Sequence, residues 1–264
     1  MRTYSDTERG QIHLRIFPPR VAEARSALVC LHPFPYSGSF FETIAPLLGA
    51  GRLICAPDCP GYGGSDPPSG MLSMEEMAAA IHEALAACRS RLSVPFDLFG
   101  FHSGCLLAVE MARLEPGRIR RMALVDVPYF TPKEQSGRYL KSTAETRYSE
   151  DISSLEDIWE FSVRRRIGDM PFERALSNFA EILRAGERAN WGYHATLTYE
   201  CAARFREVRH RTLVVATEYM LKEHTRKAAA DIPGAAFVER KDVTRAVMEQ
   251  GAPAIAEEVL AFLG

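Results

Sequence analysis

The sequence predicts an α/β fold in which a mostly parallel central sheet is covered by helices on both faces and carries an inserted helical lid. Short apolar runs of strand length alternate with longer stretches of helical periodicity in both halves of the chain. Between the halves lies a region without a convincing strand pattern. The 264 residues, 47% hydrophobic and 25% charged, suffice for one large core and a lid. We therefore expect residues 1–128 and 207–264 to form the core and residues 129–206 the lid.

The first half of the chain supplies most of the expected sheet. One alternating run, one run typical of a fully buried strand and three further strand-like runs predict its strands: Ile12–Phe17, Ser26–Leu31, Leu53–Ala56, Phe96–Phe99 and Arg121–Val127. Two stretches with apolar residues at helical spacing predict helices: Ser73–Cys88, which starts with a serine N-cap and early acidic residues, and Cys105–Leu114. Each helix precedes a further strand, as a parallel sheet requires.

The inserted region and the end of the chain complete the pattern. Three helical stretches are expected in the lid: Leu155–Ile167, Pro171–Arg184 and Tyr193–Phe205. Acidic and basic residues balance there, so the run Arg164-Arg165-Arg166 is interpreted as a solvated helix face rather than an anion site. Strands and helices then alternate again, at Thr212–Ala216, His224–Asp231, Ala236–Arg240 and Pro253–Leu263.

Composition argues against several classes of partner. The net charge is −2 and the charges are mixed along the chain, which predicts binding to neither nucleic acid nor an anionic membrane. The polar N-terminus lacks the apolar core of a signal peptide, and no run has membrane-span length, so we expect a cytoplasmic protein.

Six cysteines without metal-ligand spacing predict free thiols and no metal. No organic cofactor is expected, and a homodimer is left open.

The most informative motif is Gly100-Phe101-His102-Ser103-Gly104, placed between an apolar strand and a helix. In a G-x-S-x-G strand-to-helix turn, the glycines two residues before and after the central residue leave no room for a Cβ. This spacing puts His102 at the centre. Taking Ser103 as central would put Phe101 and a cysteine in the crowded positions. We therefore predict a nucleophile elbow that presents histidine.

With the elbow placed on this order of elements, the chain resembles the α/β-hydrolase superfamily over nearly its whole length. Two further segments carry the resemblance: Leu31-His32-Pro33-Phe34-Pro35, similar to the oxyanion loop, and Asp58-Cys59-Pro60-Gly61-Tyr62-Gly63-Gly64-Ser65, similar to the D-x-P-G-x-G-x-S turn. The resemblance implies that the backbone N–H groups of Phe34 and Ser103 form an oxyanion hole.

The family's catalytic triad does not carry over. The resemblance places Met220 where relatives have the acid, with Glu218 close by, and the loop Lys241–Ala246 where they have the histidine. No histidine follows His224. Because the three groups of a triad work as a unit, we expect no ordinary serine-hydrolase turnover.

Two functions remain for His102. In the first, its neutral imidazole, with an ordinary pKa near about 6.5, acts as base or nucleophile in a cofactor-independent hydrolase or lyase, with Asp126 orienting the ring. In the second, the site binds a small molecule or a partner without turnover, and His102 is a hydrogen-bonding group; an inert remnant is a third alternative. The expected ligand is a modest-sized, largely apolar molecule beneath the lid.

Several other residues are candidates to contact such a ligand. Tyr36 could add a donor from the oxyanion loop, and His194 could replace the missing base from the lid. The remaining candidates for the binding site are His32, Trp191 and Glu218. The sequence places His13, His82 and His210 on faces that we expect to be solvated.

Overall fold

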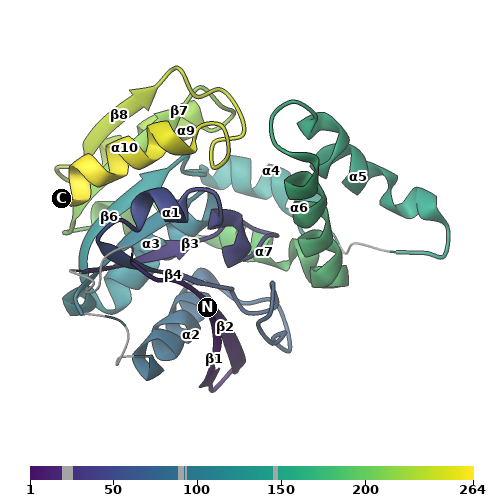
Figure 1. Cartoon of the computed structure of the whole chain (residues 1–264), viewed down its shortest axis with the longest axis horizontal. Helices are drawn as coiled ribbons and strands as arrows, with labels where there is room; N and C mark the ends of the chain where they lie inside the picture. The colour runs from purple at the N-terminus through teal and green to yellow at the C-terminus, as the bar shows by residue number, and fades with distance from the viewer. Residues whose placement is uncertain (20–25, 89–91, 93, 145–147) are drawn as a thin grey trace.

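The computed structural model describes residues 1–19, 26–88, 92, 94–144 and 148–264 (Figure 1). They form an eight-stranded sheet in the order β1-β2-β4-β3-β5-β6-β7-β8. Strand β2 is antiparallel to β1 and β4, and the strands from β4 to β8 are parallel. The strands are β1 Arg2–Thr7, β2 Gly10–Phe17, β3 Ser26–Leu31, β4 Arg52–Pro57, β5 Phe96–Phe101, β6 Ile119–Val125, β7 Arg211–Thr217 and β8 Ala236–Arg240. The predicted α/β architecture is confirmed.

Helices cover both faces of the sheet, which is why every residue of the central strands β3 and β5 is buried. One core cluster packs under α2 (Met74–Ala87), α3 (Ser103–Leu114) and α9 (Lys222–Asp231). The opposite cluster packs under α1 (Ala45–Leu48) and α10 (Ala252–Leu263). Figure 1 shows α1 and α10 in front of the sheet, with α2 on the other side.

Between β6 and β7 the described residues contain helices and no strand beyond an isolated bridge of Ile167 with Met170. These helices are α4 Pro132–Ser142, α5 Glu156–Ser162, α6 Phe172–Ala185, α7 Trp191–Thr198 and α8 Cys201–Arg206. Figure 1 shows α5 and α6 projecting to one side of the sheet. Nowhere in the described ranges does a helix combine the length and apolar character that crossing a membrane demands.

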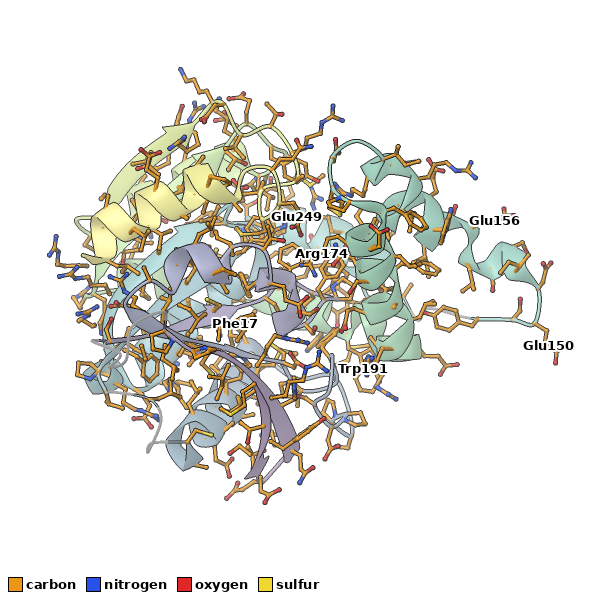
Figure 2. The ribbon with its side chains drawn as sticks, in the orientation of Figure 1. Phe17, Glu150, Glu156, Arg174, Trp191 and Glu249 are labelled. Atoms are coloured by element: carbon orange, nitrogen blue, oxygen red, sulfur yellow. The ribbon has the colours of Figure 1, made fainter. Side chains whose placement is uncertain are left out.

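An ion pair ties this helical segment to the rest of the molecule. Arg174 of α6 binds Glu249, which precedes α10, at 2.8 Å, and both side chains are at most 10% exposed. Arg174 also donates to the carbonyl oxygens of Ser39 and Phe40. Figure 2 shows Arg174 and Glu249 together where α6 approaches the core. Paired and hydrogen-bonded in this way, the two buried charges hold α6 over the end of the sheet.

Two elements that the sequence did not predict, β1 and α4, lack an apolar pattern. Strand β1 is mostly exposed and polar, and it forms because it pairs along its length with β2. Helix α4 has no buried residue, and its start is marked instead by a capping box of Thr131 and Glu134. By contrast, α2 begins directly after the predicted cap Ser73, which forms the same motif.

The prediction that His13 and His82 are solvated is wrong, because both are 4% exposed. The His82 ring Nε2 contacts the carbonyl oxygen of Met111 at 2.8 Å. The His13 ring Nδ1 lies 2.7 Å from a carboxylate oxygen of Asp58. Asp58 also accepts from the N–H groups of Gly38 and Gly64, so it organises the whole D-x-P-G turn. Both histidines are therefore structural groups.

Candidate active site

The site is built on the sharp turn between β5 and α3. His102 occupies this turn with φ 49° and ψ −124°, outside the regions that L-residues ordinarily adopt. Its N–H donates to the carbonyl oxygen of Val125 at 3.1 Å, and its own carbonyl accepts from the N–H of Cys105 at 2.8 Å. Hydrogen bonds on both sides hold the residue in this conformation, and backbone strain of this kind is concentrated at functional sites.

The packing of two glycines establishes the register of the turn. A Cβ on Gly104 would lie 1.9 Å from the carbonyl oxygen of Leu31, and one on Gly100 would lie 2.6 Å from that of Gly104. The crowded positions are therefore two residues before and two residues after His102. His102 stands at the centre of the elbow, and Ser103 is the first residue of α3.

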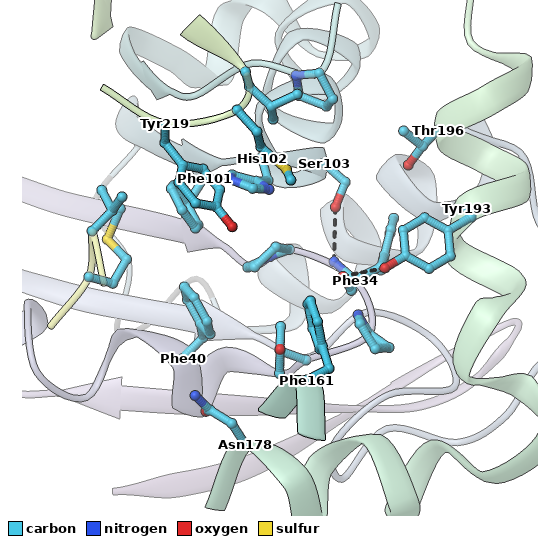
Figure 3. A pocket seen from close by; sticks show the side chains of 18 of the residues that line it. Phe34, Phe40, Phe101, His102, Ser103, Phe161, Asn178, Tyr193, Thr196 and Tyr219 are labelled. Carbon is cyan, nitrogen blue, oxygen red and sulfur yellow. Dashed lines mark hydrogen bonds between the residues drawn. The ribbon is translucent and has the colours of Figure 1, made fainter. Parts of the chain in front are cut away.

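His102 lines a cavity of about 300 Å³ below the helical segment. Its ring lies 4.2 Å from that of Phe101 and 6.1 Å from that of Tyr219, measured between centroids (Figure 3). The ring Nε2 is buried and has no hydrogen-bond partner among the residues that the structure describes. Burial, and secondarily the positive charge of Arg166, lowers the pKa of His102 to about 4. The imidazole is therefore neutral at pH 7, and its pKa lies below the value expected from the sequence.

Ser103 and Phe34 meet at the position of the expected oxyanion hole. The N–H of Phe34 donates to Oγ of Ser103 at 2.9 Å (Figure 3). The donor predicted for a substrate oxygen is thus occupied by the serine hydroxyl. A hydroxyl that accepts one hydrogen bond can still donate its own proton. Because both residues line the cavity, the Ser103 hydroxyl can therefore donate to a ligand there in place of the Phe34 N–H.

Asp126 has a different partner from the one expected. It follows β6 at φ 52°, is fully buried, and accepts hydrogen bonds from the N–H of Thr217 at 2.9 Å and from its hydroxyl at 2.7 Å. Both carboxylate oxygens therefore face β7, and no described hydrogen bond joins Asp126 to His102. The structure gives Asp126 the role of linking the ends of β6 and β7 next to the elbow.

Burial raises the pKa of Asp126 to about 6, against the opposing hydrogen bonds from Thr217. Between pH 4 and 6 the folded chain thus keeps a proton that the unfolded chain has released, so this group lowers stability as the pH rises through that interval. An Asp126→Asn variant is expected to be more stable at pH 8 by on the order of 1–3 kcal/mol, with little difference at pH 4. Urea unfolding at both pH values measures this.

The matched control is Glu218→Gln, which alters a carboxylate that is exposed and paired with Lys222. It is expected to change stability by less than about 1 kcal/mol at either pH. Equal destabilisation of Asp126→Asn at both pH values would contradict a protonated Asp126 in the folded chain.

Of the next two predicted site residues, Tyr36 and His32, only Tyr36 lines the cavity. Tyr36 lines the cavity, and burial raises the pKa of its hydroxyl to about 12, so it is a neutral donor at pH 7. His32 is fully buried, with Nδ1 3.1 Å from the carbonyl oxygen of Pro33 and Nε2 accepting from the N–H of Cys59 at 2.9 Å. With both nitrogens engaged by the backbone, His32 ties two loops together.

Three further candidates lie outside the described cavity lining. The Nδ1 atom of His194 is 2.6 Å from the hydroxyl of Tyr139, and Glu218 binds Lys222 at 2.6 Å. Trp191 lines a second, much smaller depression. The structure thus brings Phe34, Tyr36, His102 and Ser103 together at one cavity, and its described lining does not include His32, Asp126, Trp191, His194 or Glu218.

Residues at the positions where the resemblance places the acid and the histidine also line the cavity. Met220, 72% exposed, and Ala246, at φ 48°, are both among its lining residues. Of the described residues that line it, His102 is the single histidine and Glu249 the single carboxylate. Glu249 is held by Arg174. The cavity therefore offers one titratable base, His102, within the part of the chain that the structure describes.

The arginine run does not act as one solvated face. Arg164 and Arg165 pair with Glu160, and their side chains are 69% and 68% exposed, as predicted. Arg166, however, lines the cavity, with its guanidinium carbon 5.3 Å from the centroid of the Phe161 ring. The prediction is wrong for this residue, because the short 3-10 turn at Arg164–Arg166 directs consecutive side chains differently.

A sheet of this order, with a strained residue between two crowded glycines after β5, defines the class of α/β proteins built around a nucleophile elbow. Residues 28–258 match the family model described as the alpha/beta hydrolase family, and the chain belongs to that family.

Solved structures of this class superpose over nearly the whole chain. A hydrolase from Pseudomonas aeruginosa has a TM-score of 0.79 and 19% identity, covering 100% of this chain and 98% of its own. An enol-lactonase from Burkholderia xenovorans has a TM-score of 0.77 and 18% identity, covering 99% of each chain. A thermophilic esterase from Thermogutta terrifontis has a TM-score of 0.76 and 20% identity, covering 100% and 98%. At these identities the likeness establishes the fold.

Proposed function

We propose that this protein is a cofactor-independent enzyme, an atypical hydrolase or lyase, in which His102 replaces the nucleophile of its relatives. The observation that carries the proposal is the unpartnered Nε2 of a neutral imidazole, buried at the centre of a strained elbow and beside a cavity. A buried polar atom without a partner costs stability, and such a cost is typical of a site kept for function.

For hydrolysis the proposed step is general-base catalysis. Neutral His102 accepts a proton from a water molecule while the water oxygen attacks a substrate carbonyl carbon, and the resulting imidazolium returns the proton to the leaving oxygen. The hydroxyl and N–H of Ser103, together with the Phe34 N–H when the Ser103 side chain turns away, stabilise the oxyanion. In a lyase the same base removes a proton from substrate carbon or oxygen. Nucleophilic attack by the imidazole on an acyl group is the other route open to this residue.

The helical segment 129–206 is proposed to act as the lid over this site. Its residues Phe161, Asn178 and Tyr193 line the cavity, with Phe161 and Asn178 across from His102 and Tyr193 beside Phe34 (Figure 3). Most of the lining is apolar, which supports a small, largely apolar substrate. A cytoplasmic location remains part of the proposal, with a homodimer left open.

A small-molecule binding protein without turnover is the second candidate. It is favoured by one specific observation: the Phe34 N–H is already bound to Ser103 at the site where an oxyanion would lie. In that case His102 acts as a hydrogen-bonding group for the ligand.

A turnover assay on a panel of activated esters, lactones and β-keto acids separates the two candidates. The enzyme proposal expects at least one class to be converted above the buffer rate by purified protein, with no added metal or cofactor. Saturable binding of panel compounds by calorimetry without conversion of any of them would contradict it and favour the binding protein.

A further inference from the structure

Arg166 is a cation in the cavity wall that has no anionic partner among the described residues. Its side chain lines the cavity and stacks on Phe161, and no carboxylate of the described residues lies within ion-pair distance of it. The neighbouring Arg164 and Arg165 both reach Glu160 instead. A half-buried guanidinium usually has an acceptor, because its five N–H donors are costly to leave unpaired.

The charges around the cavity leave this cation uncompensated. Glu249, the one carboxylate in the described lining, is bound to Arg174 at 2.8 Å and accepts a hydrogen bond from Thr43. Arg138, the other cation in the lining, is solvent-exposed and stacks on Phe130. The influence of Arg166 reaches the elbow, since its charge contributes to the lowered pKa of His102. The described walls of the cavity are therefore electropositive.

We propose that the ligand of this cavity carries a carboxylate, which Arg166 binds while the apolar remainder of the molecule lies between the aromatic side chains and His102. A planar guanidinium pairs with a carboxylate through two parallel hydrogen bonds, and the cation–π contact with Phe161 keeps the guanidinium group of Arg166 at the cavity wall. One half-buried arginine supplies one positive charge, which matches the single charge of a carboxylate more closely than the roughly two negative charges of a phosphate monoester.

Carboxylate binding by Arg166 concerns the same site as the proposed function, and its effect on the basicity of His102 rests on that function. A carboxylate at Arg166 offsets the positive charge that disfavours protonation of His102. The bound ligand would thus make the imidazole a stronger base than it is in the empty site. Carboxylate recognition itself requires no turnover, so the two proposals can be tested apart.

The test uses calorimetric titration of the full chain with benzoate, its neutral analogue benzamide, and phenyl phosphate. Wild type is expected to bind benzoate about 10-fold or more tightly than benzamide. Arg166→Gln should remove this preference, whereas Arg166→Lys should keep part of it because the charge remains. Arg165→Gln is the matched control, since it changes an adjacent, exposed arginine, and it should behave as wild type. Thermal unfolding of each variant verifies that it is folded.

Equal binding of benzoate and benzamide by wild type overturns the inference, as does a loss in Arg165→Gln equal to that in Arg166→Gln. Tighter binding of phenyl phosphate than of benzoate overturns the assignment to carboxylates. His102→Gln is expected to retain the benzoate preference. If that preference holds while no panel substrate is turned over, the proposed enzyme fails and the carboxylate site stands.

Discussion

Replacing His102 by alanine is expected to lower kcat/KM by about 100-fold or more on any substrate that the wild type converts. The imidazole is the one histidine in the described lining of the cavity, and the positions where the resemblance places the acid and the histidine hold Met220 and the histidine-free loop Lys241–Ala246. The backbone hydrogen bonds to Val125 and Cys105 do not involve the side chain, so the variant should fold. Steady-state kinetics and thermal unfolding of the same preparation measure both effects.

Ser103→Ala is the control for this experiment. It removes the hydroxyl but frees the N–H of Phe34 for a substrate oxygen, so activity should largely persist. Wild-type activity that is lost in Ser103→Ala and kept in His102→Ala would show that the serine is the nucleophile and that our register is wrong.

The second large effect is expected at Gly104. Because a Cβ there would lie 1.9 Å from the carbonyl oxygen of Leu31, Gly104→Ala forces the start of α3 away from β3. We expect a loss of more than about 4 kcal/mol in the free energy of unfolding, or failure to fold. Urea unfolding followed by circular dichroism measures the loss.

Gly137→Ala in α4 is the matched variant, since a Cβ there meets nothing within 4 Å. Alanine in a helix interior should increase stability by about 0.5–1 kcal/mol. A Gly104→Ala protein as stable as Gly137→Ala would contradict the close approach of α3 to β3, and with it the elbow geometry.

The sequence was sufficient for those parts of the fold that rest on local patterns. The buried run Ser26–Leu31 and the strand Ala236–Arg240 have their predicted bounds. The elbow could be predicted because the glycine spacing reflects a steric requirement within a few residues. Elements without an apolar face, such as β1 and α4, left no pattern to detect.

The parts of the site that depend on long-range contacts could not be predicted. Asp126 bonds to Thr217, 91 positions away, and His13 to Asp58, 45 positions away. Nothing in the sequence distinguishes Arg166 from Arg164 and Arg165. Only the fold of the helical segment directs Arg166 to the cavity and leaves the other two exposed. Ser103 could be assigned a place beside the elbow, but its bond to Phe34 requires the packing of α3 against the loop after β3.

The central claim is that a neutral, half-buried imidazole with a buried Nε2 atom occupies the elbow beside the cavity. Nuclear magnetic resonance titration of the histidine side chains, with the His102 signal assigned by its loss in His102→Gln, tests it without a substrate. We predict that His102 stays neutral as the pH falls from 8 and protonates only near pH 4, below the ordinary value for histidine. Protonation near pH 6.5 would show a solvated ring and contradict the account.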